Sequence, residues 1–214
     1  MNQKKVMVIG STGLIGTQLI ERLSNDPAIS EIICPVRKSI PSPPPKVTYY
    51  PIDFKQLDSH TPLFQGVSAI LCCIGTTIKK AKTKEKFEWV DHDIPLHVAK
   101  IAKAEGIESY SIVTSIGARK SGGSYYLRVK GRIEAALYDI GFQRLIIYRP
   151  SFLLGKRKEF RLGEAIMIPL FNLFHWIIPK KYRATDSATL ATLMHHHLDT
   201  LESDHHIIEA DAIK

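Results

Sequence analysis

An apolar run that ends in three regularly spaced glycines constrains the fold more than any other feature of the chain. The segment KVMVIG at 5–10 has the apolar character of a buried strand, and Gly10, Gly13 and Gly16 follow at intervals of three residues. Apolar residues then repeat at the spacing of one helix face, at Leu14, Ile15, Leu19, Ile20 and Leu23. This order predicts a strand that turns through a glycine loop into a helix, the first unit of a parallel α/β sheet.

Apolar runs and turn residues continue this alternation over most of the chain. Further strands are expected at 31–36, 47–52, 68–75, 109–115 and 144–150, and helices over 88–105 and from about 124 to Gly141. The sequence PSPPP at 41–45 excludes a helix before the third strand, because proline lacks the amide donor and clashes in a helix interior. We therefore predict an α/β fold with a doubly wound parallel sheet.

Beyond Pro150 the pattern becomes looser. Helical stretches are expected near 161–176 and 186–200, followed by a short apolar segment at 206–210. At 214 residues the chain fits one domain, which we expect to span 1–214. Its core would cover 1–150, and a small C-terminal substrate or lid segment, 151–214, would be integrated with that core.

The composition is that of a soluble globular protein, with 44% hydrophobic and 23% charged residues. Only five apolar-rich residues precede Gly10 at the start, too few for the core of a signal peptide, and no apolar run reaches the length of a membrane span. Cys34, Cys72 and Cys73 lie in apolar runs, which suits reduced thiols in a cytoplasmic protein better than disulfides. The net charge of +8 comes from residues spread along the chain, so a basic surface that suits an anionic cofactor is favoured over nucleic-acid binding. No metal site is expected, because the consecutive histidines at 195–197 point in three directions on a helix.

The glycine loop and the end of the second strand together indicate a cofactor. Amides at a helix start bind phosphate, so the loop predicts a pyrophosphate site formed by Gly10, Ser11, Thr12, Gly13, Leu14, Ile15 and Gly16. The spacing is GxxGxxG rather than the standard GxGxxG, and a glycine-rich turn without a ligand is the alternative. NAD sites usually place an acidic residue at the end of the second strand, whereas this strand ends in Arg37 and Lys38. Because Arg37 suits a 2′-phosphate, NADP is preferred over NAD, with a solvated loop as the alternative for both residues.

Two adjacent tyrosines precede a lysine in the sequence SYYLRVKG at 124–131. Successive helical residues are turned by about 100°, so Tyr126 and Lys130 share one border of the apolar stripe while Tyr125 lies on the other. A nearby ammonium lowers the pKa of a tyrosine, which suits Tyr126 for proton transfer at a carbonyl oxygen. Ser115 ends the fifth strand, at the sheet edge where ligands bind, and its hydroxyl suits the substrate oxygen. Ser115, Tyr126 and Lys130 are therefore the candidate catalytic residues, although Tyr126 taken alone also suits a half-buried core position.

These motifs lie in the order and at the spacing of a known superfamily. They are VIGSTGLIG (8–16), VRK (36–38), DF (53–54), CCIGTT (72–77), VDHD (90–93), TSIGA (114–118), YLRVKG (126–131) and YRPSFLLG (148–155), and they span about two thirds of the chain. On these residues the chain resembles the atypical and extended branch of the short-chain dehydrogenase/reductase superfamily. Within it, the chain is most similar to the small NAD(P)-binding proteins related to the human Tat-interacting protein of 30 kDa.

The resemblance implies a Rossmann sheet that binds NADP, with Ser115, Tyr126 and Lys130 as a reductase triad. It also implies further cofactor contacts: Asp53 and Phe54 near the adenine, Cys73, Ile74, Gly75 and Thr76 along the ribose and pyrophosphate, and Arg149, Pro150 and Ser151 near the nicotinamide. An asparagine that often supports the proton relay in the superfamily is replaced by Asp93 here. Several members of this branch bind the cofactor but serve as regulators or assembly factors.

We therefore expect an NADP-dependent oxidoreductase that transfers a hydride to or from a small carbonyl or alcohol. An NADP-binding regulatory or assembly protein with little or no turnover is the alternative. The apolar, basic-flanked segment 165–178 suits a pocket cover first, a partner surface second and a membrane contact third. Residues 156–183 would accordingly form any contact with a protein partner or with a second copy of the chain.

Overall fold

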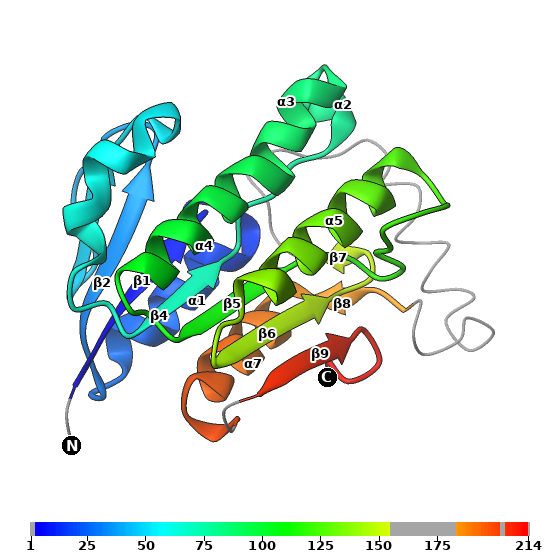
Figure 1. Cartoon of the computed structure of the whole chain (residues 1–214). Helices are drawn as coiled ribbons and strands as arrows, with labels where there is room; N and C mark the ends of the chain where they lie inside the picture. Colours follow the sequence, from blue (N-terminus) through cyan, green and yellow to red (C-terminus); the bar gives the residue numbers. More distant parts are fainter. Residues whose placement is uncertain (1–2, 155–182, 202–203, 214) are drawn as a thin grey trace.

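A seven-stranded parallel sheet forms the centre of the part of the chain that the computed structural model describes, residues 3–154, 183–201 and 204–213 (Figure 1). In spatial order the strands are β3 (Val47–Pro51), β2 (Ile29–Val36), β1 (Lys4–Ile9), β4 (Ala69–Cys72), β5 (Ser109–Val113), β6 (Arg144–Arg149) and β9 (His205–Glu209). Each neighbouring pair of these strands is parallel. The predicted doubly wound α/β sheet is therefore confirmed.

The direction in which the sheet grows reverses at β1. From β1 the chain adds β2 and β3 on one side, and then returns to add β4, β5 and β6 on the other. The backbone amide of Cys73 donates to the carbonyl of Ile9 at 2.8 Å, so β1 and β4 remain paired to the end of both strands. Open α/β sheets bind ligands outside the carboxyl ends of the strands at such a reversal.

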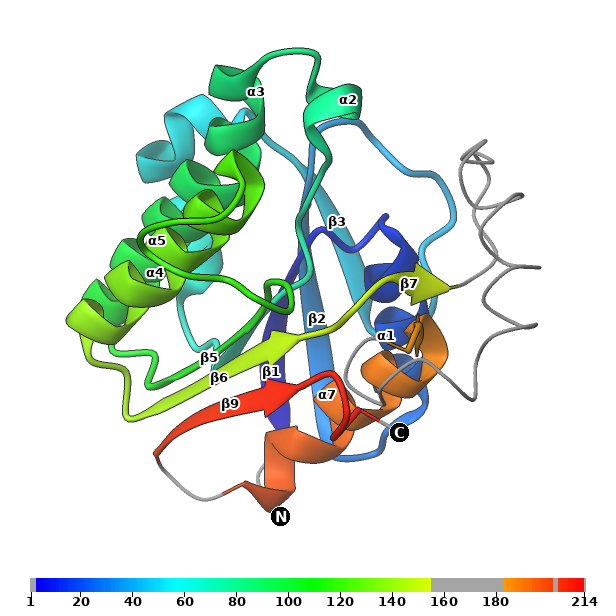
Figure 2. The ribbon, with the colours of Figure 1, turned by 90° about the vertical axis from the view of Figure 1, so that its right-hand side faces the viewer.

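Helices cover both faces of the sheet, as Figure 2 shows. They are α1 (Leu14–Asn25) and α7 (Ser187–Thr200) on one face, and the 3₁₀ helix η1 (Phe54–Phe64), α4 (Ile94–Ala104) and α5 (Tyr125–Ile140) on the other. Leu19 and Met194 belong to the core beneath the first pair, and Val98 and Ile133 to the core beneath the second group. Burial on both faces explains why the strands read as continuous apolar runs.

The helix expected over 88–105 is not one regular helix. After the short α2 (Ile78–Ala81), the chain forms α3 (Lys84–Glu88) and a π turn, η2 (Trp89–Asp93), before α4 begins. Pro95 explains the irregular turn, because it has no amide hydrogen to donate to a carbonyl in the preceding turn. Within the π turn the side chain of Asp91 is buried, with 1% of the residue exposed.

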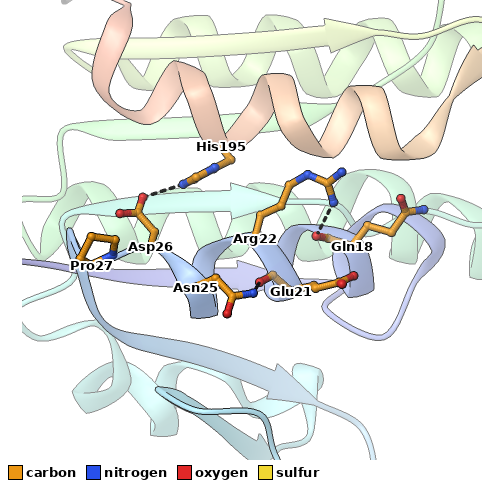
Figure 3. A pocket seen from close by; sticks show the side chains of 7 residues that line it. All are labelled: Gln18, Glu21, Arg22, Asn25, Asp26, Pro27 and His195. Atoms are coloured by element: carbon orange, nitrogen blue, oxygen red, sulfur yellow. Dashed lines mark hydrogen bonds and ion pairs between the residues drawn. The ribbon is translucent and has the colours of Figure 1, made fainter.

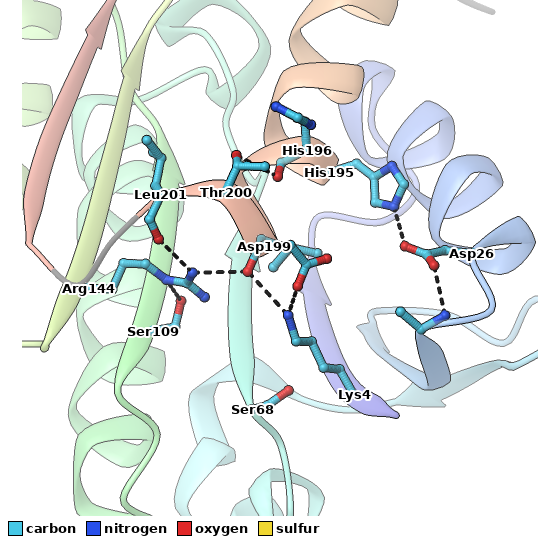
Figure 4. A network of polar contacts seen from close by, with 12 residues as sticks. Lys4, Asp26, Ser68, Ser109, Arg144, His195, His196, Asp199, Thr200 and Leu201 are labelled. Atoms are coloured by element: carbon cyan, nitrogen blue, oxygen red, sulfur yellow. Dashed lines mark hydrogen bonds and ion pairs between the residues drawn. The ribbon is translucent and has the colours of Figure 1, made fainter. Parts of the chain in front are cut away.

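The C-terminal part of the described chain belongs to the layers of the main sheet. α7 packs beside α1, and β9 extends the sheet next to β6. Arg144 of β6 donates to the Ser109 hydroxyl and to the carbonyls of Leu198 and Leu201, so β6 holds the last turn of α7. Figure 4 shows its contacts with Ser109 and Leu201. β7 (Leu153–Leu154) and β8 (Thr185–Asp186) form a separate two-stranded parallel pair.

Several expectations fall on residues that the structure does not describe. The helix expected at 161–176, the apolar segment 165–178 and all but the last residue of 156–183 lie outside the described residues. The stretches expected at 186–200 and 206–210 are α7 and β9. Among the described helices, none combines the length and apolar character needed to cross a membrane.

Candidate active site

The predicted site residues follow the carboxyl ends of neighbouring strands. The glycine loop follows β1, Arg37 follows β2, Asp53 follows β3, Cys73 follows β4 and Ser115 follows β5. Because all these strands are parallel, their carboxyl ends lie at the same edge of the sheet. The topology therefore gathers segments that are far apart in the sequence at one edge, and individual contacts decide which side chains meet there.

Close packing requires two of the three loop glycines. Gly10 has a φ of +81°, which other residues rarely adopt, and a Cβ on it would lie 2.6 Å from the amide nitrogen of Ile74. A Cβ on Gly16 would lie 2.2 Å from the carbonyl oxygen of Gly10. These two glycines therefore allow the loop, α1 and the segment after β4 to touch, whether or not a ligand binds.

Gly13 has a different role from the other two glycines. It is exposed and forms the N-cap of α1, without any side-chain hydrogen bond to the first amides of the helix. These amides suit an anion, as expected for a pyrophosphate site. The other loop residues differ in exposure: Ser11 and Ile15 are buried, Leu14 is half-buried and Thr12 is exposed.

The residues expected around the adenosine end lie at the carboxyl ends of β2 and β3. Arg37 and Lys38 are exposed, so their charges are available to a phosphate. Asp53 caps η1, where its carboxylate accepts a hydrogen bond from the amide of Lys55 at 2.9 Å. Phe54 is only 7% exposed and belongs to the core beneath.

A buried ion pair that the sequence analysis missed lies at the centre of the site. Lys130 Nζ lies 2.8 Å from Asp91 Oδ1, and the two side chains are 4% and 0% exposed. Asp91 Oδ2 also accepts a hydrogen bond of 2.8 Å from the amide of Thr76. Asp93 was expected to replace the relay asparagine, but its carboxylate pairs with His92 at 2.8 Å and is 46% exposed. The carboxylate beside Lys130 is therefore that of Asp91.

The segment 73–76 connects the glycine loop to this ion pair. Its residue Ile74 lies against Gly10, as described above. A Cβ on Gly75 would lie 3.5 Å from Asp91 Oδ1 and 3.8 Å from Lys130 Nζ. The loop near the start of the chain and the lysine of α5 therefore lie on two sides of one short segment.

The charges around Lys130 determine its protonation state. Burial lowers the pKa of Lys130, but the carboxylate of Asp91 and the charge of Tyr126 outweigh this effect and raise the pKa above its ordinary value. Lys130 is therefore an ammonium at neutral pH, and Tyr126 is close enough to interact with it electrostatically. Asp91 Oδ1 accepts no hydrogen bond of ordinary geometry, so its contact with Lys130 is chiefly one of charge.

The two tyrosines at the start of α5 have different surroundings, in line with their separate borders on the helix. The ring of Tyr126 lies against Phe87 of α3, with 5.5 Å between the centroids. The hydroxyl of Tyr125 donates to the carboxylate of Glu88, which raises the pKa of Tyr125. Glu88 also pairs with Arg132 at 2.7 Å. The hydroxyl of Tyr125 is thus hydrogen-bonded to a carboxylate, whereas Tyr126 lies on the same border of α5 as Lys130.

Ser115 lies two residues beyond β5 and is half-buried. Its hydroxyl makes only a long contact of 3.5 Å with the carbonyl of Ile116. The amide of Ile116 donates to the carbonyl of Pro150 at 2.9 Å, which joins the Ser115 loop to the end of β6. Ser151 continues from there and bonds through its hydroxyl to the carbonyl of Arg183.

The guanidinium of Arg149 is paired with two carboxylates. It donates twice to Glu134 of α5, at 3.1 and 2.6 Å, and once to Glu209 of β9, at 2.9 Å. Glu134 is 4% exposed and also accepts from the hydroxyl of Thr114 at 2.6 Å. These bonds raise the pKa of Arg149. The side chain therefore joins α5 to the last strand.

The cysteines and histidines of the described residues offer no further chemistry. Burial raises the pKa of Cys34 to about 12 and that of Cys72 to about 11, and raises the pKa of Cys73 well above its ordinary value. All three are free thiols that stay protonated, as expected. The described part of the chain contains no group of three potential metal ligands.

A groove of about 690 Å³ lies between α1 and α7, away from these residues (Figure 3). Its lining is polar and includes an ion pair of 2.6 Å between Asp26 and His195. The lining residues are Gln18, Glu21, Arg22, Asn25, Asp26, Pro27 and His195. None of the predicted site residues is among them, so the groove is separate from the candidate active site.

Proteins of similar sequence come from mammals and fungi. The chain is 34% identical to protein HTATIP2 of Rattus norvegicus over 175 aligned residues. The aligned segment covers 80% of this chain and 72% of that protein. The chain is 30% identical over 184 residues to the mitochondrial protein FMP52 of Candida glabrata, with 82% and 76% covered. Further fungal relatives are also named mitochondrial, which contradicts the expected cytoplasmic location.

Among solved structures, MoeE5 in complex with UDP-glucose and NAD has a TM-score of 0.73 at 13% identity, covering 95% of this chain and 74% of that one. At this identity the likeness concerns the fold alone, which is Rossmann-like. The HIM1 family model matches residues 43–181. The expected resemblance to NAD(P)-binding proteins of the HTATIP2 type is confirmed, and the chain belongs to the HIM1 family.

Proposed function

We propose that this protein is an NADP-dependent oxidoreductase of the short-chain dehydrogenase/reductase type, which acts on a small carbonyl or alcohol. The observation that carries the proposal is the contact of segment 73–76 with Gly10 on one side and Lys130 on the other. A dinucleotide held at the glycine loop would thereby extend toward the start of α5, where Tyr126 lies. Ser115 belongs to the same edge of the sheet.

Each residue of the triad has a distinct role in this proposal. Tyr126 would donate a proton to the substrate oxygen during reduction and accept it during oxidation. The Lys130 ammonium, fixed by Asp91, would stabilise the phenolate of Tyr126. The Ser115 hydroxyl, which makes only a long backbone contact, would donate to the same oxygen and polarise the carbonyl.

The residues around the loop fit a dinucleotide. The amides after Gly13 suit the pyrophosphate, and exposed Arg37 and Lys38 suit a 2′-phosphate, which favours NADP over NAD. When bound, NADPH would supply the hydride for reduction of a carbonyl, and NADP⁺ would accept it in oxidation of an alcohol. Asp53 and the backbone of 73–76 would line its adenosine part, while the backbone of Arg149, with Pro150 and Ser151, would border the reacting end.

The test combines cofactor binding with turnover in three variants. Tyr126→Phe should abolish NADPH oxidation across a panel of small carbonyls and leave the Kd for NADPH nearly unchanged, because only the proton donor is lost. Tyr125→Phe is the matched control and should keep activity, since its hydroxyl is bonded to Glu88. Arg37→Ala should weaken NADPH binding by about tenfold or more and leave NADH binding unchanged. Full activity in Tyr126→Phe would refute the mechanism, and equal losses for both cofactors would refute the role of Arg37.

The same experiment separates this proposal from its alternative, a regulatory or assembly protein that binds NADP with little turnover. NADPH binding without oxidation of any carbonyl would favour the alternative. The surface expected for a partner, 156–183, lies almost wholly outside the described residues. We further infer that 1–214 forms one domain, in which the C-terminal segment 151–214 is integrated with the core 1–150.

A further inference from the structure

A basic cluster lies beside the proposed site, on α2 and α3. The sequence IKKAKTKEK at 78–86 contains five lysines, all of them exposed. α2 begins at Ile78, directly after its cap Thr77, and thus within two residues of the segment that contacts Lys130. The cluster therefore belongs to the same edge of the sheet as the candidate active site.

Contacts between α3 and the start of α5 place part of this cluster next to the tyrosines. Phe87 of α3 packs against Tyr126, with 5.5 Å between the ring centroids. Lys84, three residues earlier, has its Nζ 5.4 Å from the centroid of the Tyr125 ring. The Phe87 ring also lies 6.2 Å from that of Tyr125, so α3 covers both tyrosines and places the Lys84 ammonium over Tyr125, beside Tyr126.

The cluster carries more lysines than carboxylates. In the described part of the chain, no ion pair with a carboxylate involves Lys79, Lys82, Lys84 or Lys86. α3 itself carries two carboxylates: Glu85 is exposed between Lys84 and Lys86, and Glu88 is occupied by Tyr125 and Arg132. The excess of lysines therefore gives a positive potential beside the two tyrosines.

From this placement we propose that the substrate of the site is an anion, with a carboxylate or phosphate on the part that projects toward α2 and α3. The proposal rests on the function proposed above. A cleft bordered by charge of one sign concentrates ligands of the opposite sign and raises their association rates by tenfold or more. A protein partner fits the cluster less well, because interface cores are depleted in lysine and rich in aromatic residues, and Ile78 is the only large apolar side chain that α2 exposes.

The test uses two aldehydes of nearly equal shape, 4-carboxybenzaldehyde and its neutral analogue 4-formylbenzamide. With NADPH at low ionic strength, kcat/KM for the carboxylate should exceed that for the amide by about tenfold or more. Raising the salt concentration to 0.2 M should reduce this preference. The Debye length is then below about 10 Å, so the attraction between exposed charges that lie farther apart is largely screened. Equal kcat/KM values for the two aldehydes would overturn the proposal.

Two double variants identify the charges responsible. K79Q/K84Q should lower kcat/KM for the carboxylate several-fold and leave that for the amide unchanged. K5Q/K100Q, which removes the same charge from β1 and from the exposed side of α4, should alter neither value. A preference for the carboxylate that survives in K79Q/K84Q, or falls equally in both variants, would refute the role of the cluster.

A binding measurement keeps this test independent of turnover. The alcohols 4-(hydroxymethyl)benzoate and 4-(hydroxymethyl)benzamide can be titrated into the NADPH-saturated protein, where no reaction can follow. If neither aldehyde is reduced, the proposed function fails for this pair, but tighter binding of the benzoate that is lost in K79Q/K84Q still supports an anion site. Equal affinities would overturn the anion site. Capture of phosphatidylserine vesicles that depends on these lysines, without any benzoate preference, would assign the cluster to lipid instead.

Discussion

Asp91 provides the sharpest test of the site, because it holds both Lys130 and the backbone of Thr76. Replacing Asp91 with alanine leaves a buried ammonium without its partner, and leaves the amide of Thr76 without its acceptor. At the observed separation of 2.8 Å, an effective dielectric constant of about 20 gives an attraction of about 6 kcal/mol, an upper bound before desolvation is deducted. Measured losses on breaking such buried pairs are about 3–5 kcal/mol.

We therefore expect Asp91→Ala to lower the free energy of unfolding by about 4 kcal/mol, which includes roughly 1 kcal/mol for the unpaired amide. For a chain of 214 residues this corresponds to a fall in Tm of about 8–16 °C. Asp91→Asn isolates the charge, since its side-chain oxygen still accepts from Thr76. The double variant Asp91→Asn/Lys130→Met removes both charges and should regain most of the stability lost in Asp91→Asn.

Thermal and urea unfolding of the four proteins measures these differences. The raised pKa of Lys130 also determines how the stability of the wild type depends on pH. The charged lysine contributes fully to stability below its unfolded pKa, about 10.4. This contribution is lost as the pH rises through the higher pKa of the folded state. In Asp91→Asn, burial without the Asp91 charge lowers the pKa of Lys130, so the gap between wild type and this variant should be widest near neutral pH and should narrow as the pH rises toward 10. The reasoning is refuted if Asp91→Ala unfolds within 2 °C of wild type, which is about 0.5–1 kcal/mol, or if the double variant is no more stable than Asp91→Asn.

Two further predictions concern charges near the site. Arg149→Met should lower the free energy of unfolding by about 3–5 kcal/mol, because the buried carboxylate of Glu134 loses its partner, while the Kd for NADPH stays unchanged. Weaker NADPH binding without loss of stability would instead place the Arg149 side chain at the nicotinamide. Tyr125→Phe should raise the pKa of Glu88, since the hydrogen bond from Tyr125 is the main reason that this pKa is lowered, ahead of the charge of Arg132. In wild type the contribution of Glu88 is present above its unfolded pKa and is lost as the pH falls through the lower folded value, so the variant should show a shallower loss of stability in acid. Identical acid unfolding curves for the two proteins would contradict this assignment.

The sequence predicted the sheet because its strands carry local signals. Continuous apolar runs bounded by glycine and proline identified the strands, although 68–75 proved to be longer than β4. The helix expected over 88–105 was only partly right. Helical periodicity identified α4, but the effect of Pro95 on the preceding turn depends on how the chain packs there. α2 and α3 were not predicted, because helices of four or five residues carry too little periodicity to be recognised. η1 was not predicted, because it is a 3₁₀ helix interrupted at Gln56 and lacks the 3.6-residue period of an α-helix.

Helical geometry also separated Tyr126 from Tyr125, since a rotation of about 100° per residue requires no knowledge of the rest of the fold. The partner of Lys130 was not accessible in this way. In the sequence VDHD, Asp91 and Asp93 are equivalent as acidic residues, and only the π turn decides which of them is buried beside α5. The same holds for Glu134, whose burial against Arg149 and Thr114 involves residues distant in the chain.

The amino-acid sequence by itself determined the order of strands and helices, the position of the glycine loop and the face of α5 that carries Tyr126. These features depend on backbone preferences and on the spacing of apolar residues within short windows. Only the tertiary structure decided which carboxylate neutralises which cation: Asp91 beside Lys130, and Glu134 with Glu209 beside Arg149. The physical reason is that ion pairing depends on distance and burial, and both are set by the packing of segments from different parts of the chain.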